Sequence, residues 1–333
     1  MRSAVEQPPS FVSIIVPVRN EQGTIASTLD AILEQDIDEP FEIVIADGGS
    51  TDSTPLVLAE YEATHAGRVR VVANPAGGTP QALNVLLAAA RGDVIVRIDA
   101  HSSPPKDYVR HLVGHIRAGE CEGAGAQKRA VGRGSFGQAV ALAHSSKFGI
   151  GDSKYHYATE VGYVDHVPFG AYLREKAREI GGWDENLVRN QDYDFDYRYG
   201  QAGGRLLLDP RVVIDWNVRE HPRALARQYF EYGYWKYRVL QKHPSSLHLR
   251  WLIPPAFVAV LGVGVPAAVV WPAARVAVGG IVVAYLVFLA GAVITMRPRA
   301  RGVASRLPLA IATMHVSWGA GFLASAVRRV GRR

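Results

Sequence analysis

The chain contains 333 residues, of which 48% are hydrophobic and 20% are charged, and its formal net charge is +6 at pH 7. This length suffices for one large domain with an appendage, and the composition is typical of a globular protein. The single cysteine, Cys121, excludes an intrachain disulfide framework and suits a reducing compartment. The positive charge predicts a polyanionic partner, namely nucleic acid, an anionic membrane surface or a phosphorylated substrate.

Hydrophobic residues are unevenly distributed along the chain. Up to about residue 244 the sequence is charged and mixed, whereas after Trp251 valine, alanine, leucine and glycine dominate. Residues 1–10 lack the apolar segment of a signal peptide, so we expect the soluble part to remain in the cytoplasm. The sequence therefore predicts a mixed N-terminal part and an apolar C-terminal part.

The N-terminal part alternates between strand and helix patterns. Short apolar runs rich in β-branched residues predict buried parallel strands, and apolar residues at helical spacing predict the helices between them. This alternation is typical of a doubly wound α/β fold. The predicted elements are a strand at 11–16, a helix at 23–35, a strand at 41–46, a helix from Thr54, a strand at 69–73, a helix from the turn at 77–80 to about 91, and a strand at 94–98.

Carboxylates follow two of these predicted strands. Asp47 ends the second strand and Asp99 ends the fourth, and ligands of open α/β sheets bind beyond the carboxyl ends of the strands. His101 follows two residues after Asp99, and a carboxylate and an imidazole can together bind one divalent cation. Two alternatives stay open: Asp47 could cap its own glycine-rich turn, and Asp99 and His101 could belong to a plain polar loop.

Three motifs follow the first, second and fourth predicted strands. They are Pro17-Val-Arg-Asn-Glu21, Asp47-Gly-Gly-Ser-Thr-Asp52 and Asp99-Ala-His101. Over roughly residues 11–240 the set resembles the family 2 glycosyltransferases, in particular the succinoglycan-type bacterial membrane enzymes. The resemblance implies a GT-A fold, which is a Rossmann-like, doubly wound mixed sheet, and a nucleotide-diphosphate sugar as the donor. It also implies a nucleotide-sugar pocket formed by Pro17, Val18, Arg19, Glu21, Asp47, Gly48, Asp99 and Gly170.

The same resemblance implies a metal site. Asp99 corresponds to the first residue of the family's DxD-type motif, which holds the ribose and the metal-bound diphosphate, and His101 replaces the second aspartate. Imidazole ligates Mn²⁺ but is a poorer partner for Mg²⁺. We therefore expect a divalent metal, Mn²⁺ or Mg²⁺, at Asp99 and His101.

A run of alternating acids follows further along the chain. On a helix Asp192 and Asp196 share a face, whereas Asp194 points elsewhere. The resemblance implies that Asp192 is the general base, with Gln191 standing where the family carries an acid. An alternative, strongest for Asp194, is a structural aspartate that the helix dipole favours near a helix N-terminus.

Glycine-rich segments separate the remaining predicted elements. Gly132, Gly134 and Gly137 match the G-x-G-x-x-G fingerprint, but they follow four strands instead of one, so we expect a flexible loop. Residues 149–155 could close over substrate or form an ordinary surface loop. The other predicted elements are a strand at 164–172, in which Gly170 permits close backbone approach to a ligand, a helix at 174–182, and strands at 206–208 and 212–214.

Basic and aromatic residues precede the apolar part. His221 and Arg223 could face diphosphate oxygens or be solvated. Residues 228–238 mix aromatic with basic side chains, which is compatible with RNA binding, but the position before an apolar segment favours an interfacial helix. Gln228 and Trp235 weakly resemble the Gln-x-x-Arg-Trp segment of processive family 2 enzymes at a different spacing, so they are candidates for the acceptor rim only.

The apolar part contains three candidate membrane helices, at 252–271, 276–296 and 307–327. The first two lack charge and are closely connected, so we expect a hairpin. Arginines cluster at 297–301 and at Arg328, Arg329, Arg332 and Arg333, and the positive-inside rule would place both clusters in the cytoplasm. A single third span cannot satisfy both; three spans is the simpler count, and a re-entrant or interfacial third helix is the alternative.

Together these observations predict an inverting glycosyltransferase of the bacterial inner membrane, with a cytoplasmic catalytic domain and no nucleic acid partner. The resemblance implies a nucleotide-diphosphate sugar as the donor, with UDP favoured, and, together with the apolar segments, a lipid-linked saccharide used in cell-surface polysaccharide synthesis as the acceptor. The alternatives are transfer to polyprenyl monophosphate, a non-catalytic nucleotide-sugar-binding scaffold, and an RNA-binding membrane protein. The predicted divisions are a tail at 1–10, a catalytic domain at 11–218, interfacial helices at 219–250 and a membrane domain at 251–333.

Overall fold

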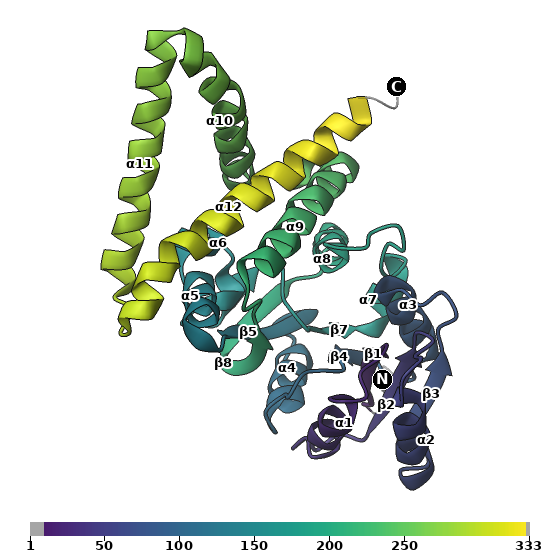
Figure 1. Ribbon diagram of the computed structural model, residues 1–333. Coiled ribbons are helices and arrows are strands. Elements are labelled where there is room, and N and C mark those ends of the chain that lie inside the picture. The colour runs from purple at the N-terminus through teal and green to yellow at the C-terminus, as the bar shows by residue number, and fades with distance from the viewer. Residues whose placement is uncertain (1–9, 331–333) are drawn as a thin grey trace. The chain divides into compact units, whose positions relative to one another are not determined.

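The computed structural model describes residues 10–330 (Figure 1). The predicted tail, apart from Ser10, and the predicted arginine cluster at Arg332 and Arg333 lie outside the described residues. The chain forms two compact units: the first comprises the residues up to 128 together with 158–215, and the second comprises 129–157 together with the residues from 216 onward. Residues 129–157 therefore belong with the C-terminal helices.

An eight-stranded mixed sheet organises the first unit, in the order β3-β2-β1-β4-β7-β5-β8-β6. The first four strands are parallel, with Val12 paired to both Phe41 and Val94, whereas β7 runs antiparallel to β4. The sheet thus confirms the predicted doubly wound, mixed α/β class. The strands are β1 (Val12–Val18), β2 (Phe41–Asp47), β3 (Val69–Ala73), β4 (Val94–Arg97), β5 (Gly123–Val131), β6 (Gly162–Val164), β7 (Ala171–Leu173) and β8 (Leu206–Asn217).

Helices cover both faces of this sheet, which is why its central strands read as continuous apolar runs. Alternate residues of one strand enter different cores: Ile14 packs with Leu29 of α1, whereas Ile15 packs in the core that contains Leu83 of α3. Helices α2 and α3 begin at Thr54 and Thr79, as predicted, and each has a proline in its first turn. The helices are α1 (Ile25–Leu33), α2 (Thr54–Thr64), α3 (Thr79–Ala89), α4 (Tyr108–Arg117), α7 (Arg174–Glu179) and α8 (Gln191–Gln201).

Three predicted segments differ in the structure. The strand predicted at 164–172 is replaced by β6 and β7 with a loop between them, because Phe169 adopts a positive φ of 49° that a strand cannot continue through. The two strands predicted at 206–208 and 212–214 are one strand, β8. The loop predicted at Gly132 to Gly137 is wrong in its second half, since helix α5 begins at Gly134.

Helices alone build most of the second unit. Its core joins α5, α9 and α12 through Val140, Leu225, Leu307 and Ile311. Helices α10 and α11 meet at Trp271 and expose apolar side chains along their lengths. The helices of this unit are α5 (Gly134–His144), α6 (Lys147–Ile150), η1 (Lys154–His156), α9 (Pro222–Lys242), η2 (Pro244–Ser246), η3 (Leu249–Leu252), α10 (Ile253–Val270), α11 (Pro272–Met296) and α12 (Arg301–Val330).

Three helical segments are long and apolar enough to cross a membrane. They are Leu249–Val270, Pro272–Met296 and Arg301–Arg328. These correspond to the three segments that hydropathy predicted, and each begins three to six residues earlier than predicted.

Candidate active site

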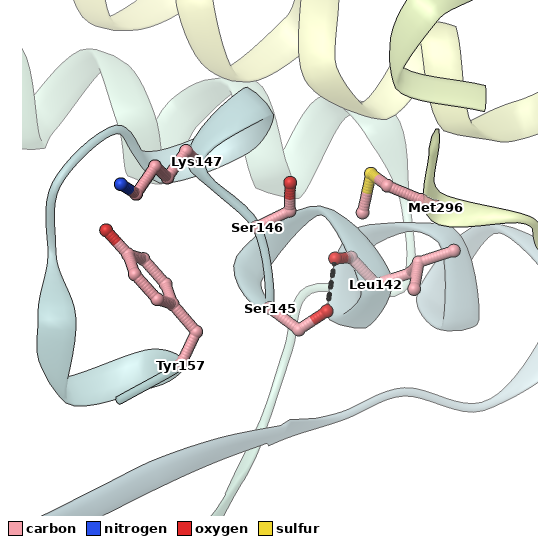
Figure 2. A pocket seen from close by; sticks show the side chains of 6 residues that line it. All are labelled: Leu142, Ser145, Ser146, Lys147, Tyr157 and Met296. Atoms are coloured by element: carbon pink, nitrogen blue, oxygen red, sulfur yellow. Dashed lines mark hydrogen bonds between the residues drawn. The ribbon is translucent and has the colours of Figure 1, made fainter. Parts of the chain in front are cut away.

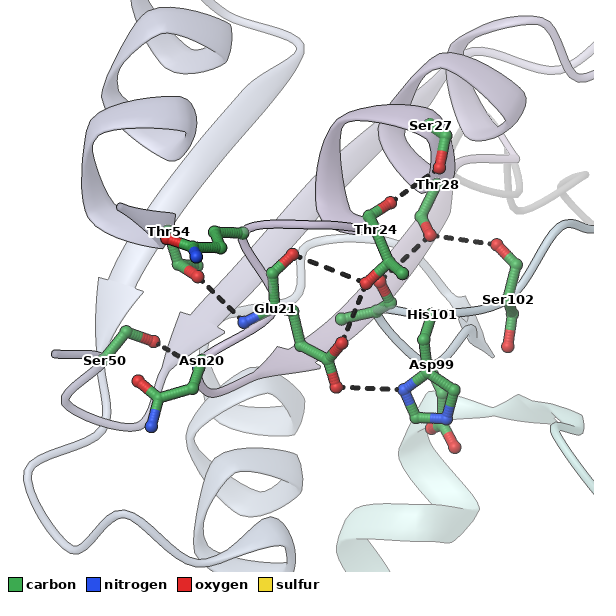
Figure 3. Close-up of polar contacts among 12 residues, drawn as sticks. Asn20, Glu21, Thr24, Ser27, Thr28, Ser50, Thr54, Asp99, His101 and Ser102 are labelled. Carbon is green, nitrogen blue, oxygen red and sulfur yellow. Dashed lines mark hydrogen bonds and ion pairs between the residues drawn. The ribbon is translucent and has the colours of Figure 1, made fainter. Parts of the chain in front are cut away.

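The loops after β1 and β2 interlock at the carboxyl edge of the sheet. The backbone N–H of Asn20 donates to Ser50 Oγ at 2.8 Å, and that of Glu21 donates to Thr54 Oγ1 at 2.9 Å (Figure 3). Asn20 has a positive φ of 55°, which turns the chain sharply after Val18. These bonds bring the predicted segments 17–21 and 47–54 together.

Asp47 caps its own turn. Its Oδ1 accepts hydrogen bonds from the backbone N–H of Ser50 at 3.1 Å and from Ser50 Oγ at 2.7 Å, which is the turn geometry considered as an alternative for this residue. Beside it, the Gly48 N–H donates to the Val18 carbonyl at 2.9 Å, and Arg19 donates to the carbonyl of Gly77 at 3.4 Å. The Asp47 turn and the Arg19 side chain therefore line the same edge.

A carboxylate holds His101. The His101 Nδ1 lies 3.0 Å from Glu21 Oε1, while Glu21 Oε2 accepts from Thr24 Oγ1 at 2.8 Å (Figure 3). Thr28 of α1 lies 3.0 Å from the carbonyls of both Ala100 and Ser102, which fixes the loop that carries His101. The imidazole is 54% exposed, so its other nitrogen faces solvent-accessible space.

Arg97 contacts both Asp99, a predicted metal ligand, and Asp192, the predicted general base. Arg97 ends β4, and its side chain is only 8% exposed. Its guanidinium donates to Asp99 Oδ1 at 3.0 Å, and another nitrogen forms an ion pair with Asp192 in the first turn of α8. The structure thus brings together Asp99 and Asp192, which lie 93 positions apart in the sequence.

The loop before β7 completes this cluster. The Arg97 backbone N–H donates to the carbonyl of Gly170 at 3.1 Å, and Tyr108 Oη donates to the carbonyl of Phe169 at 2.6 Å. The Phe169 ring lies 5.9 Å from the Arg97 guanidinium carbon and 5.0 Å from Lys128 Nζ. Gly170 therefore supports Arg97 through its backbone.

The charges in this cluster influence one another. Burial opposes the charged form of Arg97, but Asp192 and Asp99 outweigh it and raise the pKa of the guanidinium above its ordinary value. Burial, assisted by Arg97, lowers the pKa of Lys128 to about 8, against the opposing effect of Asp99 and Asp192. Two cations and two carboxylates thus share one partly enclosed space.

Sequence reasoning missed Arg97 and Lys128. One signal was present for Arg97, which is the only charged residue within the otherwise apolar segment 94–98. A buried strand carries such a residue at little cost only when partners are available. Nothing in the local sequence distinguished Lys128 from the neighbouring Arg129.

The other two acids of α8 have structural partners. Asp194 is buried and its Oδ2 accepts from Arg198 Nε at 2.8 Å, one turn further along the same helix. Asp196 accepts from His166 at 2.6 Å and from Tyr172 Oη at 2.8 Å, and burial raises its pKa. Asp192, at 34% side-chain exposure, is the most accessible of the three. Gln191 begins α8 directly before it.

The residues around Asp99 suit a divalent ion in part. Asp99 Oδ1 is used by Arg97, and Oδ2 makes no hydrogen bond within residues 10–330. His101 engages Glu21 through Nδ1, so Nε2 is the nitrogen that would be available to a metal ion. No cluster of three or more histidine, cysteine or acidic side chains that could hold a metal occurs among the described residues. The protein therefore offers two ligands, which fits an ion that a diphosphate also ligates.

The four remaining predicted residues lie on or beside α9 in the second unit. His221 and Arg223 are exposed at the start of the helix. Gln228 Nε2 donates to Tyr232 Oη at 3.1 Å, while its buried Oε1 has no hydrogen-bond partner within the described chain. Trp235 is half-buried and contacts the Tyr234 ring at 5.9 Å. These residues are spread along the helix and do not form one cluster.

The second unit also contains a shallow pocket of about 340 Å³ (Figure 2). None of the residues predicted for the site lines it. Its lining residues are Leu142, Ser145, Ser146, Lys147, Tyr157 and Met296.

Comparisons with known proteins agree on the class of this chain. Residues 13–181 match the family model of glycosyl transferase family 2. The succinoglycan biosynthesis protein ExoA of Rhizobium meliloti (strain 1021) is 32% identical over 311 residues, which cover 93% of each chain. An enzyme of Methanococcus voltae, dolichyl N-acetyl-alpha-D-glucosaminyl phosphate 3-beta-D-2,3-diacetamido-2,3-dideoxy-beta-D-glucuronosyltransferase, is 25% identical over 76% of this chain and 80% of its own.

A solved structure shares the fold. The mannosyltransferase PcManGT from Pyrobaculum calidifontis, in complex with GDP-Man and Mn²⁺, superposes with a TM-score of 0.64 at 20% identity. The match covers 97% of this chain and 88% of the other. The predicted GT-A architecture is thereby confirmed.

Proposed function

Because this chain belongs to glycosyl transferase family 2 and is a glycosyltransferase, we propose that it transfers a sugar from a nucleotide-diphosphate sugar to a lipid-linked saccharide with inversion at the anomeric carbon. One observation carries the proposal: Arg97 holds Asp99 and Asp192 in a single ion-paired cluster. The candidate donor-site carboxylate and the candidate base are thereby kept beside one another. As an enzyme, the chain does not fit the non-catalytic scaffold considered from the sequence.

The donor would bind at the carboxyl edge of the sheet. We assign the nucleotide to the segments Pro17 to Glu21 and Asp47 to Gly48, and the diphosphate to the surroundings of Asp99. Lys128 adds positive charge to the cluster at neutral pH, because its pKa stays at about 8 despite burial. PcManGT was solved with GDP-Man, whereas the sequence interpretation favoured UDP, so the experiment below includes both nucleotide classes.

A divalent ion held by Asp99 and His101 would supply positive charge beside the diphosphate leaving group when bound. Glu21 orients His101 through Nδ1, as carboxylates commonly do for metal-binding histidines. The Mn²⁺ in PcManGT supports a divalent metal in this fold, and an imidazole ligand favours Mn²⁺ over Mg²⁺.

Asp192 would act as the general base. Its carboxylate accepts the proton of the acceptor hydroxyl as that oxygen attacks the anomeric carbon, and the nucleotide diphosphate leaves from the opposite face. Arg97 fixes the position of this carboxylate, so the base loses less conformational freedom when the transition state forms. Asp194 and Asp196 are engaged in the core and do not compete for this role.

The acceptor and the membrane location are inferred from the relatives and the apolar helices. ExoA is a succinoglycan biosynthesis protein, and the name of the Methanococcus voltae enzyme gives a dolichyl N-acetylglucosaminyl phosphate as its acceptor. We propose a lipid-linked acceptor for a cell-surface polysaccharide, a location in the bacterial inner membrane, and a cytoplasmic catalytic unit.

The proposal is tested by thermal unfolding of the purified protein in detergent, titrated with UDP-, GDP- and dTDP-sugars with and without Mn²⁺. A ligand that binds the folded state raises the apparent Tm by mass action. We expect a Mn²⁺-dependent increase with one nucleotide class, which Asp99→Asn abolishes. If folded protein shows no increase with any nucleotide, the donor site is wrong.

A further inference from the structure

Helix α12 has the composition of a membrane span but not the surroundings of one. Among the three candidate spans, 39% of the α12 window is buried inside the protein, against 6% and 11% for the segments containing α10 and α11. Its buried side chains include Leu307, Ile311 and Met314, which pack against α5 and α9. Helix α12 also contacts the hairpin, where Gly319 abuts Pro254 of α10 and His315 lies 3.1 Å from Tyr285 Oη of α11. Helix α12 is therefore packed against several helices of the second unit, whereas most of the hairpin is exposed.

The partner of α12 is helix α9, and the two backbones touch. Figure 1 shows α12 lying along α9. A Cβ on Gly233 of α9 would collide with the carbonyl of Trp318, and a Cβ on Gly321 would collide with the carbonyl of Phe230. The Tyr237 and Phe322 rings pack edge to face at 5.0 Å. No lipid can separate helices in such contact, so both must lie at the same depth in or beside a membrane.

Helix α9 is too polar for the bilayer interior. It carries six charged residues spread from its first turn to its last residue, and each charged side chain at the bilayer centre is strongly unfavourable. Lys236 is buried with its Nζ 4.2 Å from the Trp251 ring, within the segment that contacts α12. The charged side chains of α9 are Arg223, Arg227, Glu231, Lys236, Arg238 and Lys242.

Both ends of α12 are also held by the packed part of this unit. A Cβ on Gly302 would meet Ser135 of α5, and the Arg328 guanidinium lies over the Tyr234 ring of α9 at 5.8 Å. A helix that crossed the membrane would carry one of these ends to the opposite surface, together with the element that contacts it.

The face of α12 that points away from α9 is a narrow apolar stripe. Its exposed large hydrophobic residues are Leu309, Val316 and Val327. Val316 and Val327 follow Leu309 by 7 and 18 residues, which is close to two and five full helical turns, so all three lie on one side of the helix. Exposed arginines accompany the stripe: Arg297, Arg299, Arg301, Arg306 and Arg328. An apolar stripe with basic residues is suited to the surface of an anionic membrane, with the side chains of the stripe inserted between headgroups.

We propose that α12 lies along the cytoplasmic membrane surface and that only α10 and α11 cross the bilayer, as a hairpin. This inference rests on the membrane attachment put forward above as part of the proposed function. A hairpin returns the chain to the side it left, so the arginines at 297–301 and Arg328 lie on the same side, as the positive-inside rule requires. The conflict that three spans create is thereby removed.

Single-cysteine labelling tests the arrangement. Cys121 is buried, and burial raises its pKa to about 11, so the native thiol reacts slowly. Each new cysteine can therefore be introduced into the full chain with Cys121 retained. The variants are Ala273→Cys at the tip of the hairpin, Ala300→Cys after α11 and Val327→Cys near the end of α12, all at exposed positions. Each is treated with a membrane-impermeant maleimide in sealed inside-out and right-side-out vesicles.

We expect Ala300→Cys and Val327→Cys to be labelled in inside-out vesicles and Ala273→Cys in right-side-out vesicles. Labelling of Val327→Cys from the side opposite to Ala300→Cys would overturn the surface position of α12 while leaving the hairpin intact. Labelling of Ala273→Cys from the same side as Ala300→Cys would instead overturn the membrane hairpin, and with it the proposed attachment. The two failures are therefore distinguishable.

A depth measurement provides a second readout that does not depend on thiol access. Fluorescent labels on Leu309→Cys, Val316→Cys and Val327→Cys are quenched by lipids that carry a nitroxide group at a known depth. A surface helix predicts the same shallow depth for all three labels. A span predicts depths that differ by as much as the rise between Leu309 and Val327, about 27 Å at 1.5 Å per residue, and that result would refute the proposal.

Discussion

Replacing Arg97 by lysine tests the cluster on which the proposed mechanism depends. Lysine keeps the positive charge but has a single ammonium group, which cannot hold Asp99 and Asp192 from two edges as the guanidinium does. One carboxylate is therefore released. We expect the enzyme to fold but to position its base poorly.

The size of the effect follows from the lost contact. A hydrogen bond to a charged group contributes roughly 1.5–3 kcal/mol, and Asp192 is 34% exposed, so solvent screening favours the lower part of that range. A loss of about 1.5–2 kcal/mol in the transition state corresponds to a decrease of about 10- to 30-fold in kcat. The KM for the donor should change less if Asp99 keeps the remaining contact.

The assay uses the nucleotide sugar that raises the apparent Tm in the thermal titration, together with membranes that supply the acceptor. It measures release of the nucleotide diphosphate. Arg117→Lys is the matched control, because Arg117 also bridges two carboxylates, Glu39 and Asp93, at the opposite end of β4. The control should keep its kcat. An unchanged kcat in Arg97→Lys, or an equal loss in both variants, would refute the assigned role of Arg97.

Two further predictions concern other groups of the first unit. Asp192→Asn should abolish transfer to a hydroxyl acceptor while leaving donor binding in the thermal titration intact; retained transfer would instead favour a polyprenyl monophosphate, an acceptor that is already an anion and needs no base. Burial opposes protonation of His115, but hydrogen bonds to Asp209 and Glu120 outweigh it and raise the pKa of His115. The interaction of protonated His115 with these two carboxylates therefore stabilises the fold fully below about pH 6.5, the unperturbed pKa of histidine, and this contribution is lost as pH rises through the raised pKa. His115→Gln should lower the apparent Tm at pH 6 more than at pH 9, and an equal loss at both would contradict the assignment.

The parallel half of the sheet was predictable because its signals are local. Each strand from β1 to β4 is a short, mainly apolar run rich in β-branched residues, and turn residues separate it from the next helix. Such runs are buried on both faces wherever helices alternate with them. The order of the elements along the chain was therefore sufficient for this half.

The antiparallel half was not predictable in this way. Strand β5, Gly-Ala-Gly-Ala-Gln-Lys-Arg-Ala-Val, consists of residues with low strand propensity, and its pairing with β7 and β8 is what makes it a strand. The break at Phe169 likewise depends on tertiary contacts, since Tyr108 holds its carbonyl. These strands exist because of neighbours that are distant in the sequence.

The sequence alone determined the glycosyltransferase family, the strand-end positions of Asp47 and Asp99 and the presence of long apolar helices, since motifs and hydropathy are properties of short segments. Only the tertiary structure revealed that Arg97 pairs with Asp192 from α8, that Asp194 and Asp196 are occupied in the core, and that α12 packs against a charged helix. Spacing along the chain gives no information on which side chains form ion pairs with one another, and the hydropathy of a helix does not show which other helix it packs against. Contacts between distant residues decide both, because burial and pairing depend on what lies opposite each side chain in space.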